Sequence, residues 1–403
     1  MLRKLRLLLM TAALVSGCGE IKEDSPELAL SNTQSMGQVS QRKASSSKSQ
    51  IKMFIGQDLQ SIRGYVKNRH LPRPTGVTTY LAFYQLLNPS FPSYGGLGLD
   101  DRAYPTHQSV DWGAGPLNAF ALAKEYPNAD LNIGLNLAEG DQSSIWVPNG
   151  LKAIVRGDYD REINRLASFI KAIPNPVYLR IGYEFDGVWN RGYERKNDYI
   201  AAFRHIVNTL RKSKTSNAYF VWQASASPID DLIESKREKI EDWYPGDAYV
   251  DLIGLSWFLT ADQRRDGAAT QRELANEVVQ FARRNQKGVI IAEAAPQGYD
   301  LAEGTKANIS PLWDGAAGEA VQKLDSRQIW QQWFQPFFAF INKNRDIIVG
   351  FSYINADWNS QPLWSAPYQN GYWGDSRIQS NKALAKLWTR EVQKLSIKPV
   401  TED

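Results

Sequence analysis

Two glutamates stand at the ends of short apolar runs, and their type and placement favour chemistry. Glu184 ends a run that begins at Val177, and Glu293 ends a run that begins at Val289. The carboxyl ends of parallel strands meet where loops converge, so an acid at such an end is within reach of a substrate. Retaining hydrolysis of a glycosidic bond requires two carboxyl groups of this kind, one as acid/base and one as nucleophile.

The run that leads to Glu184 also carries a cation. On an ideal strand Arg180 and Gly182 share a face with Glu184, so Arg180 is predicted to point into the same interior. There it would hold a carboxylate ionised or orient it by hydrogen bonding. A purely structural Arg–Glu pair at the rim is the alternative. Asp186, just before Gly187, is expected to order the loop or to contact a sugar hydroxyl.

The second acid ends a run that is otherwise apolar. A charge there is costly unless it is paired or functional. Ala294 and Ala295 follow Glu293 and leave room beside it, as a nucleophile that approaches an anomeric carbon requires. A salt bridge to Arg180 or another basic group is the structural alternative for this acid.

Aromatic residues give a third indication of a carbohydrate ligand. The chain has 13 Trp, and flat indole faces cover the C–H faces of pyranose rings while their N–H groups bond hydroxyls. A single loop Trp more often packs than binds. Trp189, Trp257 and Trp358 each closely follow a predicted strand end, so these three are predicted to contact substrate. Tyr183 and Asn355 are predicted to bind substrate or to support the site.

From residue 51 onward, short apolar runs alternate with amphipathic helices, which is typical of a parallel α/β fold. Eight such runs favour a closed (β/α)8 barrel with long βα loops over an open sheet. The predicted strands are Ile51–Gly56, Val77–Tyr84, Leu131–Leu137, Val177–Tyr183, Ala218–Trp222, Val250–Ser256, Val289–Ala292 and Ile347–Tyr353. Glu184 then belongs to the fourth strand and Glu293 to the seventh.

Other segments are predicted to surround the strands. An aromatic helix over residues 326–344 contains Pro336 and is expected to be kinked or split there. Residues 85–130 and 294–325 are predicted to be long loops on the functional face, because they are rich in Gly, Pro and aromatic residues.

The N-terminal residues are predicted to form a leader outside the fold. Residues 1–17 combine a basic start with an apolar run too short to span a bilayer. The Val-Ser-Gly-Cys segment at residues 15–18 resembles a bacterial lipobox, which implies cleavage before Cys18 and its acylation. Cys18 is the only cysteine of the chain. An ordinary signal peptide with an incidental cysteine is the alternative.

The remainder is predicted to be a lipidated, Ser-rich tether over residues 18–50 and one catalytic domain over residues 51–395. Gly19 after the cysteine points to the outer membrane if the host is diderm. The leader holds three of the 47 basic residues, so the rest of the chain is nearly balanced against its 43 acidic residues. This balance implies no nucleic-acid partner, and a monomer is expected.

No metal or cofactor is predicted. The three histidines stand in no metal-ligand spacing, and phosphate loops, dinucleotide fingerprints and Gly-x-Ser-x-Gly elbows are absent from the sequence.

Five segments together form a more specific pattern. They are Glu184-Phe185-Asp186-Gly187, Trp243-Tyr244-Pro245-Gly246-Asp247, Glu293, Phe351-Ser352-Tyr353-Ile354-Asn355-Ala356-Asp357-Trp358 and Trp373-Gly374-Asp375-Ser376-Arg377. The pattern resembles glycoside hydrolase family 26, the last two segments its bacterial outliers, and covers residues 51–391. The resemblance implies a (β/α)8 barrel of the retaining clan, with Glu184 as acid/base and Glu293 as nucleophile.

Two neighbours of this pair depart from the β-mannanases of that family. Tyr183 stands where they have His, and Trp257 or Phe258 stands where many have a Tyr that bonds the nucleophile. The expectation is therefore a retaining endo-β-glycosidase acting on a polysaccharide. β-Mannan is the first candidate, and β-1,3-xylan, mixed-linkage glucan or a matrix polysaccharide are alternatives. A non-catalytic polysaccharide-binding lipoprotein on a degenerate barrel is the alternative from another functional class.

Overall fold

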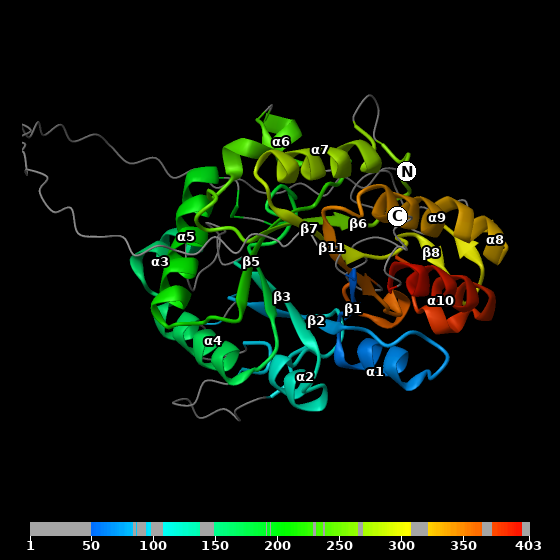
Figure 1. The fold of residues 1–403 in the computed structure, drawn as a ribbon, viewed down its shortest axis with the longest axis horizontal. Helices are drawn as coiled ribbons and strands as arrows, with labels where there is room; N and C mark the ends of the chain where they lie inside the picture. The colour runs from blue at the N-terminus through cyan, green and yellow to red at the C-terminus, as the bar shows by residue number, and fades with distance from the viewer. Residues whose placement is uncertain are drawn as a thin grey trace, which may run out of the picture. The chain divides into compact units, whose positions relative to one another are not determined.

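Eight parallel strands close into a barrel (Figure 1). They are β1 (Lys52–Gly56), β2 (Gly76–Ala82), β3 (Asp130–Asn136), β4 (Val177–Ile181), β5 (Ala218–Ala224), β6 (Leu252–Trp257), β7 (Gly288–Ala294) and β11 (Ile348–Ile354). Each strand pairs in parallel with its neighbour around the ring, and β1 closes on β11. The predicted (β/α)8 barrel is confirmed, with β11 as its eighth strand.

The computed structural model describes most of the chain after residue 49. The described residues are 50–83, 86, 94–97, 108–137, 149–190, 192–193, 195–228, 231–236, 238–264, 269–307, 321–364 and 373–396. The predicted leader, the lipidation site Cys18 and nearly all of the predicted tether lie outside these residues.

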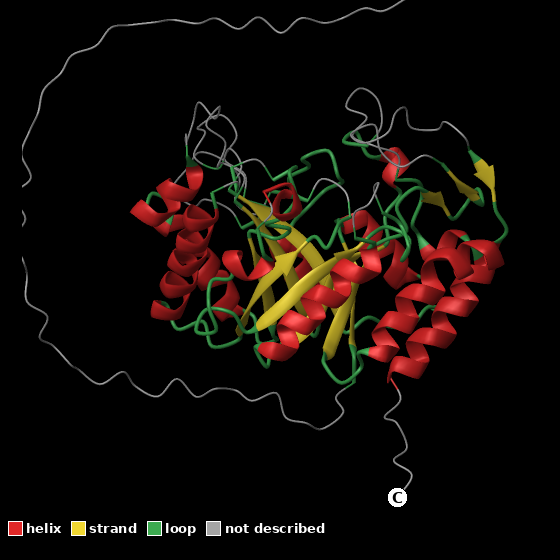
Figure 2. Ribbon diagram, turned by 90° about the horizontal axis from the view of Figure 1, so that it is seen from above, coloured by secondary structure: helices red, strands yellow, loops and turns green. Residues whose placement is uncertain are grey.

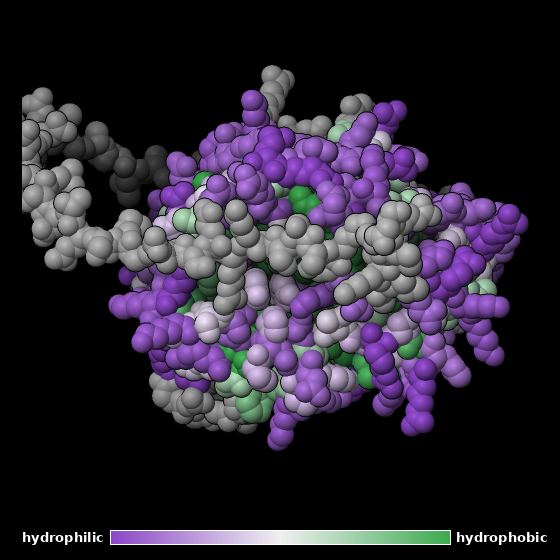
Figure 3. All heavy atoms as spheres, viewed as in Figure 1, coloured by the Kyte–Doolittle hydropathy of each residue, from purple (hydrophilic) through white to green (hydrophobic). Residues whose placement is uncertain are grey.

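Helices cover the outer side of the barrel (Figure 2). They are α1 (Leu59–Lys67), α2 (Ala119–Glu125), α3 (Gly150–Arg156), α4 (Asp160–Ala172), α5 (Lys196–Lys212), α6 (Leu232–Lys236), α7 (Gln271–Arg284), α8 (Ser326–Ile329), α9 (Gln335–Lys343) and α10 (Lys382–Ser396). Short helical turns are η1 (Ile240–Trp243), η2 (Trp330–Phe334), η3 (Trp358–Ser360) and η4 (Ile378–Ser380). Hydrophilic residues predominate on the face shown in Figure 3. None of the described helices has the length and apolar composition of a membrane span.

The aromatic helix predicted over residues 326–344 is split, as expected from Pro336. α8 runs into the π-helical segment η2, and α9 follows with Pro336 in its first turn. Proline has no N–H to donate and its ring crowds the carbonyl four residues earlier, so a wider turn before it relieves the clash.

Two predicted loops contain short elements. The segment 85–130 includes α2, and the segment 294–325 includes the strands β8 (Tyr299–Asp300), β9 (Thr305–Lys306) and β10 (Gln322–Lys323). These three strands form a small antiparallel sheet apart from the barrel.

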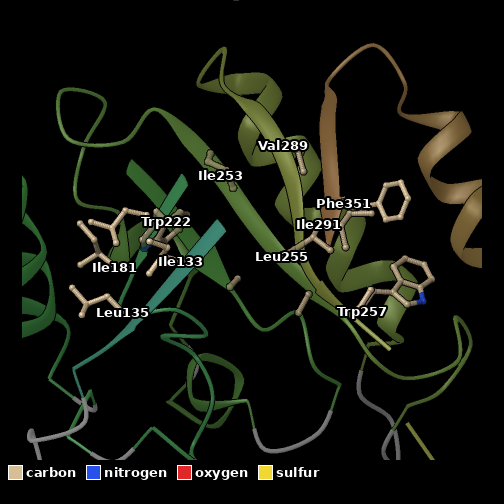
Figure 4. Packing of buried hydrophobic residues seen from close by; sticks show 14 of the residues in the cluster. Ile133, Leu135, Ile181, Trp222, Ile253, Leu255, Trp257, Val289, Ile291 and Phe351 are labelled. Carbon is tan, nitrogen blue, oxygen red and sulfur yellow. The ribbon is translucent and has the colours of Figure 1, made fainter. Parts of the chain in front are cut away.

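Apolar side chains form one core outside the barrel wall and a second core inside it. Between strands and helices, the larger cluster includes Ile291 and Phe351 (Figure 4). The inner cluster consists of Phe54, Tyr178, Val221, Ile290 and Ala292. Phe54 of β1 meets Tyr178 of β4 with ring centroids 5.4 Å apart, although these strands are not neighbours, so the contact crosses the interior.

A layer of polar side chains lies next to this inner apolar cluster. The Thr78 and Ser352 hydroxyls lie 2.6 Å apart, and the Asn132 amide donates to Thr78 at 3.0 Å and to the Ala292 carbonyl at 3.2 Å. Arg180, Gln223 and Ser256 are fully buried as well. The interior is therefore polar next to the strand ends that carry the two glutamates.

Candidate active site

Glu184 sits on a tight turn directly after β4. Gly182 and Glu184 have left-handed backbone, with φ of 55° and 51°. This conformation is uncommon for a residue other than glycine, and such strain concentrates at functional sites. The Asn190 amide donates to the carbonyls of Tyr183 at 3.2 Å and Glu184 at 2.7 Å, which holds the turn closed. Because β4 ends at Ile181, the direction of the Glu184 side chain is set by this turn and not by the alternation of side chains along the strand.

A bulge in β7 turns Glu293 into the barrel. Leu255 pairs with Ile291, but the next residue, Ser256, pairs with Glu293, so Ala292 is an extra residue on β7. Strict alternation would place Glu293 on the outer face with Ile291, which packs under the helices. The extra residue re-aims the carboxylate inward, as bulges beside active sites do.

One buried cation connects the two carboxyl groups. The Arg180 guanidinium donates to the Glu293 carboxylate and, at 3.1 Å, to Gln223 Oε1. Gln223 Nε2 donates to Ser256 Oγ at 2.9 Å, and Ser256 Oγ donates to Glu184 Oε1 at 2.7 Å. Arg180 therefore pairs directly with Glu293, the ion pair left open as the structural alternative for that acid, and reaches Glu184 only through two intervening side chains.

Gln223 and Ser256 are site residues that the sequence pattern did not predict. Each is a polar residue in an apolar strand, and burial of such residues is a usable signal once the inward face is known. The sequence alone does not fix which face of β5 or β6 points inward.

The environment of Glu184 favours its protonated form. Burial and then the charge of Glu293 raise the pKa of Glu184 to about 8, while hydrogen bonds from Ser256 and Trp189 oppose the rise. At neutral pH Glu184 therefore holds a proton that it can donate. The buried Glu293 carboxylate is compensated by the Arg180 cation, so the two acids have opposite electrostatic environments.

Trp189 and Tyr183 lie beside the two acids, and their contact with substrate stays a prediction. Trp189 Nε1 donates to Glu184 Oε2 at 2.9 Å, and 42% of the residue's surface is exposed. A Cβ on Gly187 would come within 2.3 Å of the indole, so only glycine lets the ring lie there. The Tyr183 ring lies 5.2 Å from the Arg180 guanidinium, and the Tyr80 ring lies 4.9 Å from it.

Asp186 orders a loop, which is one of the two roles foreseen for it. Its Oδ1 accepts from the Ser225 backbone N–H at 2.6 Å, just beyond β5. Burial raises the pKa of Asp186 to about 6. Its hydrogen bonds go to Ser225 and the Ala226 backbone, and 3% of its surface is exposed, so the structure supports the loop-ordering role.

Trp257 is a core residue, so the prediction that it contacts substrate is wrong. It is fully buried (Figure 4). Its ring lies 4.9 Å from that of Phe340 and 6.1 Å from that of Phe337, both on α9. Successive strand side chains point to opposite faces, so the inward Ser256 leaves Trp257 on the outer face. It cannot contact a sugar from there.

Asn355 and Trp358 also hold the structure together. Asn355 is fully buried, donates to the Ser61 carbonyl at 3.3 Å and accepts from the Ile378 N–H at 2.8 Å. Trp358 has 3% of its surface exposed and donates to Ser376 Oγ at 2.8 Å. Both residues therefore have structural roles, in place of the substrate contacts predicted for them.

A partly exposed aromatic pair lies on Trp358. The Trp373 and Trp364 rings are 4.6 Å and 5.6 Å from the Trp358 ring. They belong to a cluster with Ala295, two residues after Glu293. These two rings and that of Phe258 are the partly exposed aromatic members of this cluster, whereas Trp358 is buried.

Across the described residues, no group of three or more His, Asp or Glu side chains is arranged to hold a metal ion.

Known proteins match this chain at several levels. Residues 152–298 match the family model described as Glycosyl hydrolase family 26, and this stretch contains both glutamates. A β-1,3-xylanase, TXYA, from Vibrio sp. is 36% identical over 340 residues, which cover 84% of this chain and 64% of the relative. A β-1,3-xylanase from Alcaligenes sp. is 35% identical, with 84% and 62% covered. The chain thus spans just under two thirds of the length of these relatives.

Solved structures share the fold. A GH26 β-mannanase from Bacteroides ovatus is 13% identical, with a TM-score of 0.50, and covers 88% of this chain and 94% of its own. A modular endo-β-1,4-mannanase from Cellulomonas fimi is 13% identical, with a TM-score of 0.50, and covers 87% of this chain and 71% of its own. The family match, the two curated relatives and the barrel agree with the resemblance read from the sequence: this chain is similar to proteins of glycoside hydrolase family 26.

Proposed function

We propose that this protein is a retaining endo-β-glycosidase that hydrolyses a polysaccharide, with Glu184 as acid/base and Glu293 as nucleophile. One observation carries the proposal. Two carboxyl groups at the ends of β4 and β7 are buried together, yet one is paired with a cation while the other has its pKa raised to about 8. Two carboxyl groups in opposite environments can act as acid and nucleophile at the same pH.

The first step forms a glycosyl ester. Glu184 gives its proton to the glycosidic oxygen as the bond between that oxygen and the anomeric carbon breaks. The Glu293 carboxylate attacks the anomeric carbon from the opposite side. Trp189 and Ser256 hold the two oxygens of Glu184 in place during this transfer.

The second step returns both acids to their starting states. Esterification removes the negative charge of Glu293, and with it the second largest cause of the raised pKa of Glu184. Glu184 ionises and takes a proton from water, whose oxygen attacks the anomeric carbon and releases Glu293. Two displacements leave the sugar in its original β configuration.

β-1,3-Xylan is the substrate we propose. The curated relatives at 36% and 35% identity carry the name β-1,3-xylanase. The mannanases match at 13% identity, which speaks for the fold and not for the sugar. Tyr183 in place of the mannanases' His favours the same change from the first expectation of β-mannan.

A panel of polymers tests the function. Wild type and Glu184→Gln are incubated with β-1,3-xylan, β-mannan and mixed-linkage glucan, and products are sized by chromatography. We expect wild type to shorten β-1,3-xylan to a mixture of oligosaccharides, with little product from the variant. Proton NMR should show that the newly formed reducing ends have the β anomeric configuration when they are first released. Binding without shortening by wild type would instead identify the non-catalytic binding protein.

Activity is expected to fall as the pH rises through about 8, the raised pKa of Glu184. Glu184 must be protonated to act as acid, and a group with that pKa is protonated below pH 8 and ionised above it. The kcat/KM for polymer should therefore decline by about tenfold per pH unit on the alkaline side. An aryl glycoside whose phenol leaves without protonation should lack this limb. An identical limb for both substrates would contradict the acid role of Glu184.

We propose further that Cys18 anchors the protein to a membrane by lipid, at the outer membrane if the host is diderm. The lipobox-like segment at residues 15–18 and the single cysteine support this. Expressed in a diderm bacterium, wild type should appear in the membrane fraction and incorporate labelled palmitate, whereas Cys18→Ser should do neither. Equal labelling of the two proteins would refute acylation at Cys18.

A further inference from the structure

The hydrogen bonds between Arg180 and Glu184 all run in one direction. A guanidinium can only donate, so Arg180 must face Oε1 of Gln223. This fixes the amide and leaves Gln223 Nε2 to donate to Ser256. The Ser256 hydroxyl, having accepted, is left to donate to Glu184 Oε1. The cation therefore determines the orientation of every group up to the acid.

Burial gives this chain of bonds its strength. Arg180, Gln223 and Ser256 are all fully buried, and the two acids are nearly so. In a medium of low dielectric constant each hydrogen bond polarises the next one, and bonds to a charged group are the strongest. The three residues come from β4, β5 and β6, so the barrel wall itself sets their spacing.

We propose that Gln223 and Ser256 are positioning residues that link the Arg180 guanidinium to Glu184, so that one buried cation serves both carboxyl groups. This inference rests on the proposed function of the two glutamates. It adds two residues to the machinery, neither of which reacts with substrate.

The link explains how Glu184 can change roles between the two steps. Before the reaction, the charge of Glu293 faces Arg180 and opposes ionisation of Glu184. Once Glu293 is an ester, Arg180 has lost its anionic partner, and the chain through Gln223 and Ser256 directs its polarising effect to Glu184. Ionised Glu184, the base of the second step, is thereby favoured. Among the described residues, Asp186 and Trp189 of its own turn also act on Glu184, and Tyr183 interacts with it.

The barrel offers a matched control for this series of hydrogen bonds. Ser352 is also a fully buried serine, and its hydroxyl lies 2.6 Å from that of Thr78. Its hydrogen bond involves no carboxylate. Ser352→Ala and Ser256→Ala remove the same atom from the same barrel interior, so only a specific link to Glu184 separates their effects.

The test is a direct titration of Glu184. Protein labelled with carboxyl-¹³C glutamate is titrated by NMR, and Glu184→Gln identifies the resonance. We expect Ser256→Ala to raise the pKa of Glu184 by about one unit, since a hydrogen bond to an ionised group is lost. Ser352→Ala should leave that pKa unchanged. A merely structural Ser256 would lower stability without moving this titration.

Gln223 is tested through Ser256. Gln223→Met keeps the length of the side chain and removes its hydrogen bonds, so the pKa of Glu184 should rise by less than in Ser256→Ala. The double variant should titrate like Ser256→Ala alone, because Gln223 acts only through the hydroxyl. Additive shifts would exclude Gln223 from the link.

The outcomes separate this inference from the proposed function. An unchanged pKa of Glu184 in Ser256→Ala, or an equal shift in Ser352→Ala, overturns the link even if wild type hydrolyses polysaccharide. If wild type cleaves no polymer but Ser256→Ala shifts the titration as expected, the proposed function fails while the hydrogen-bonded link stands.

Discussion

Replacing Glu293 with Gln is expected to abolish polysaccharide hydrolysis, with kcat falling roughly 10⁴- to 10⁶-fold, the scale on which nucleophiles act. An amide is a poor nucleophile and cannot form the glycosyl ester on which the second displacement depends. The shape of the side chain is nearly kept, so the barrel should still fold. The assay is the release of reducing ends from the polymer that wild type degrades best, with circular dichroism as the check on folding.

An aryl glycoside with a good leaving group distinguishes the two glutamates. Its first displacement needs little acid help, so Glu184→Gln should form the glycosyl ester rapidly and release a burst of phenol before a slow second step. Glu293→Gln should give no burst. A burst from Glu293→Gln, or its absence in both variants, would show that the roles have been assigned wrongly.

Arg180→Met is expected to lower the free energy of unfolding by about 3–5 kcal/mol, because it leaves the buried Glu293 carboxylate without its cation. Methionine fills much of the space of the arginine stem, so the loss reflects the stranded charge more than a cavity. Urea unfolding at neutral pH measures the change. Activity should fall as well, since Arg180 also orients the Glu293 carboxylate.

A surface ion pair provides the comparison. Arg63 donates to Glu125 at 2.8 Å, and both side chains are substantially exposed. Arg63→Met should cost less than about 1 kcal/mol, as exposed ion pairs do. Arg180→Met combined with Glu293→Gln should be more stable than Arg180→Met alone. Equal losses for the two arginines would show that the buried pair is not the source of the effect.

The barrel could be predicted because its strands are local patterns. Eight apolar runs separated by helical or loop segments define the strands whatever their register, and each predicted strand overlaps an observed one. Glu184 and Glu293 were found because an acid at the end of such a run is visible in the sequence. The curated relatives and the family match agree with this fold and family.

The direction in which a side chain points is harder to predict from the sequence than the position of its strand. The bulge at Ala292 reverses the alternation of β7, and no residue type in that run announces it. On β6 the same question decides between Ser256 and Trp257: the sequence pattern predicts an inward indole, whereas Ser256 points inward and Trp257 packs on the helix side. Asn355 was misjudged because its partners, Ser61 and Ile378, are remote in sequence.

The pairing of β1 with β11 also has a consequence for how the chain folds. Lys52 pairs with Gly350, and Trp388 Nε1 donates to the Tyr65 hydroxyl at 3.0 Å across 323 positions of sequence. Closing so long a loop costs entropy that no local contact repays, so the ring closes late. During synthesis β1 therefore keeps one unpaired edge until residues 348–354 emerge, and an open edge is a site for aggregation. Strands β4 to β7, which carry both acids, are neighbours throughout and can assemble before the ring is complete.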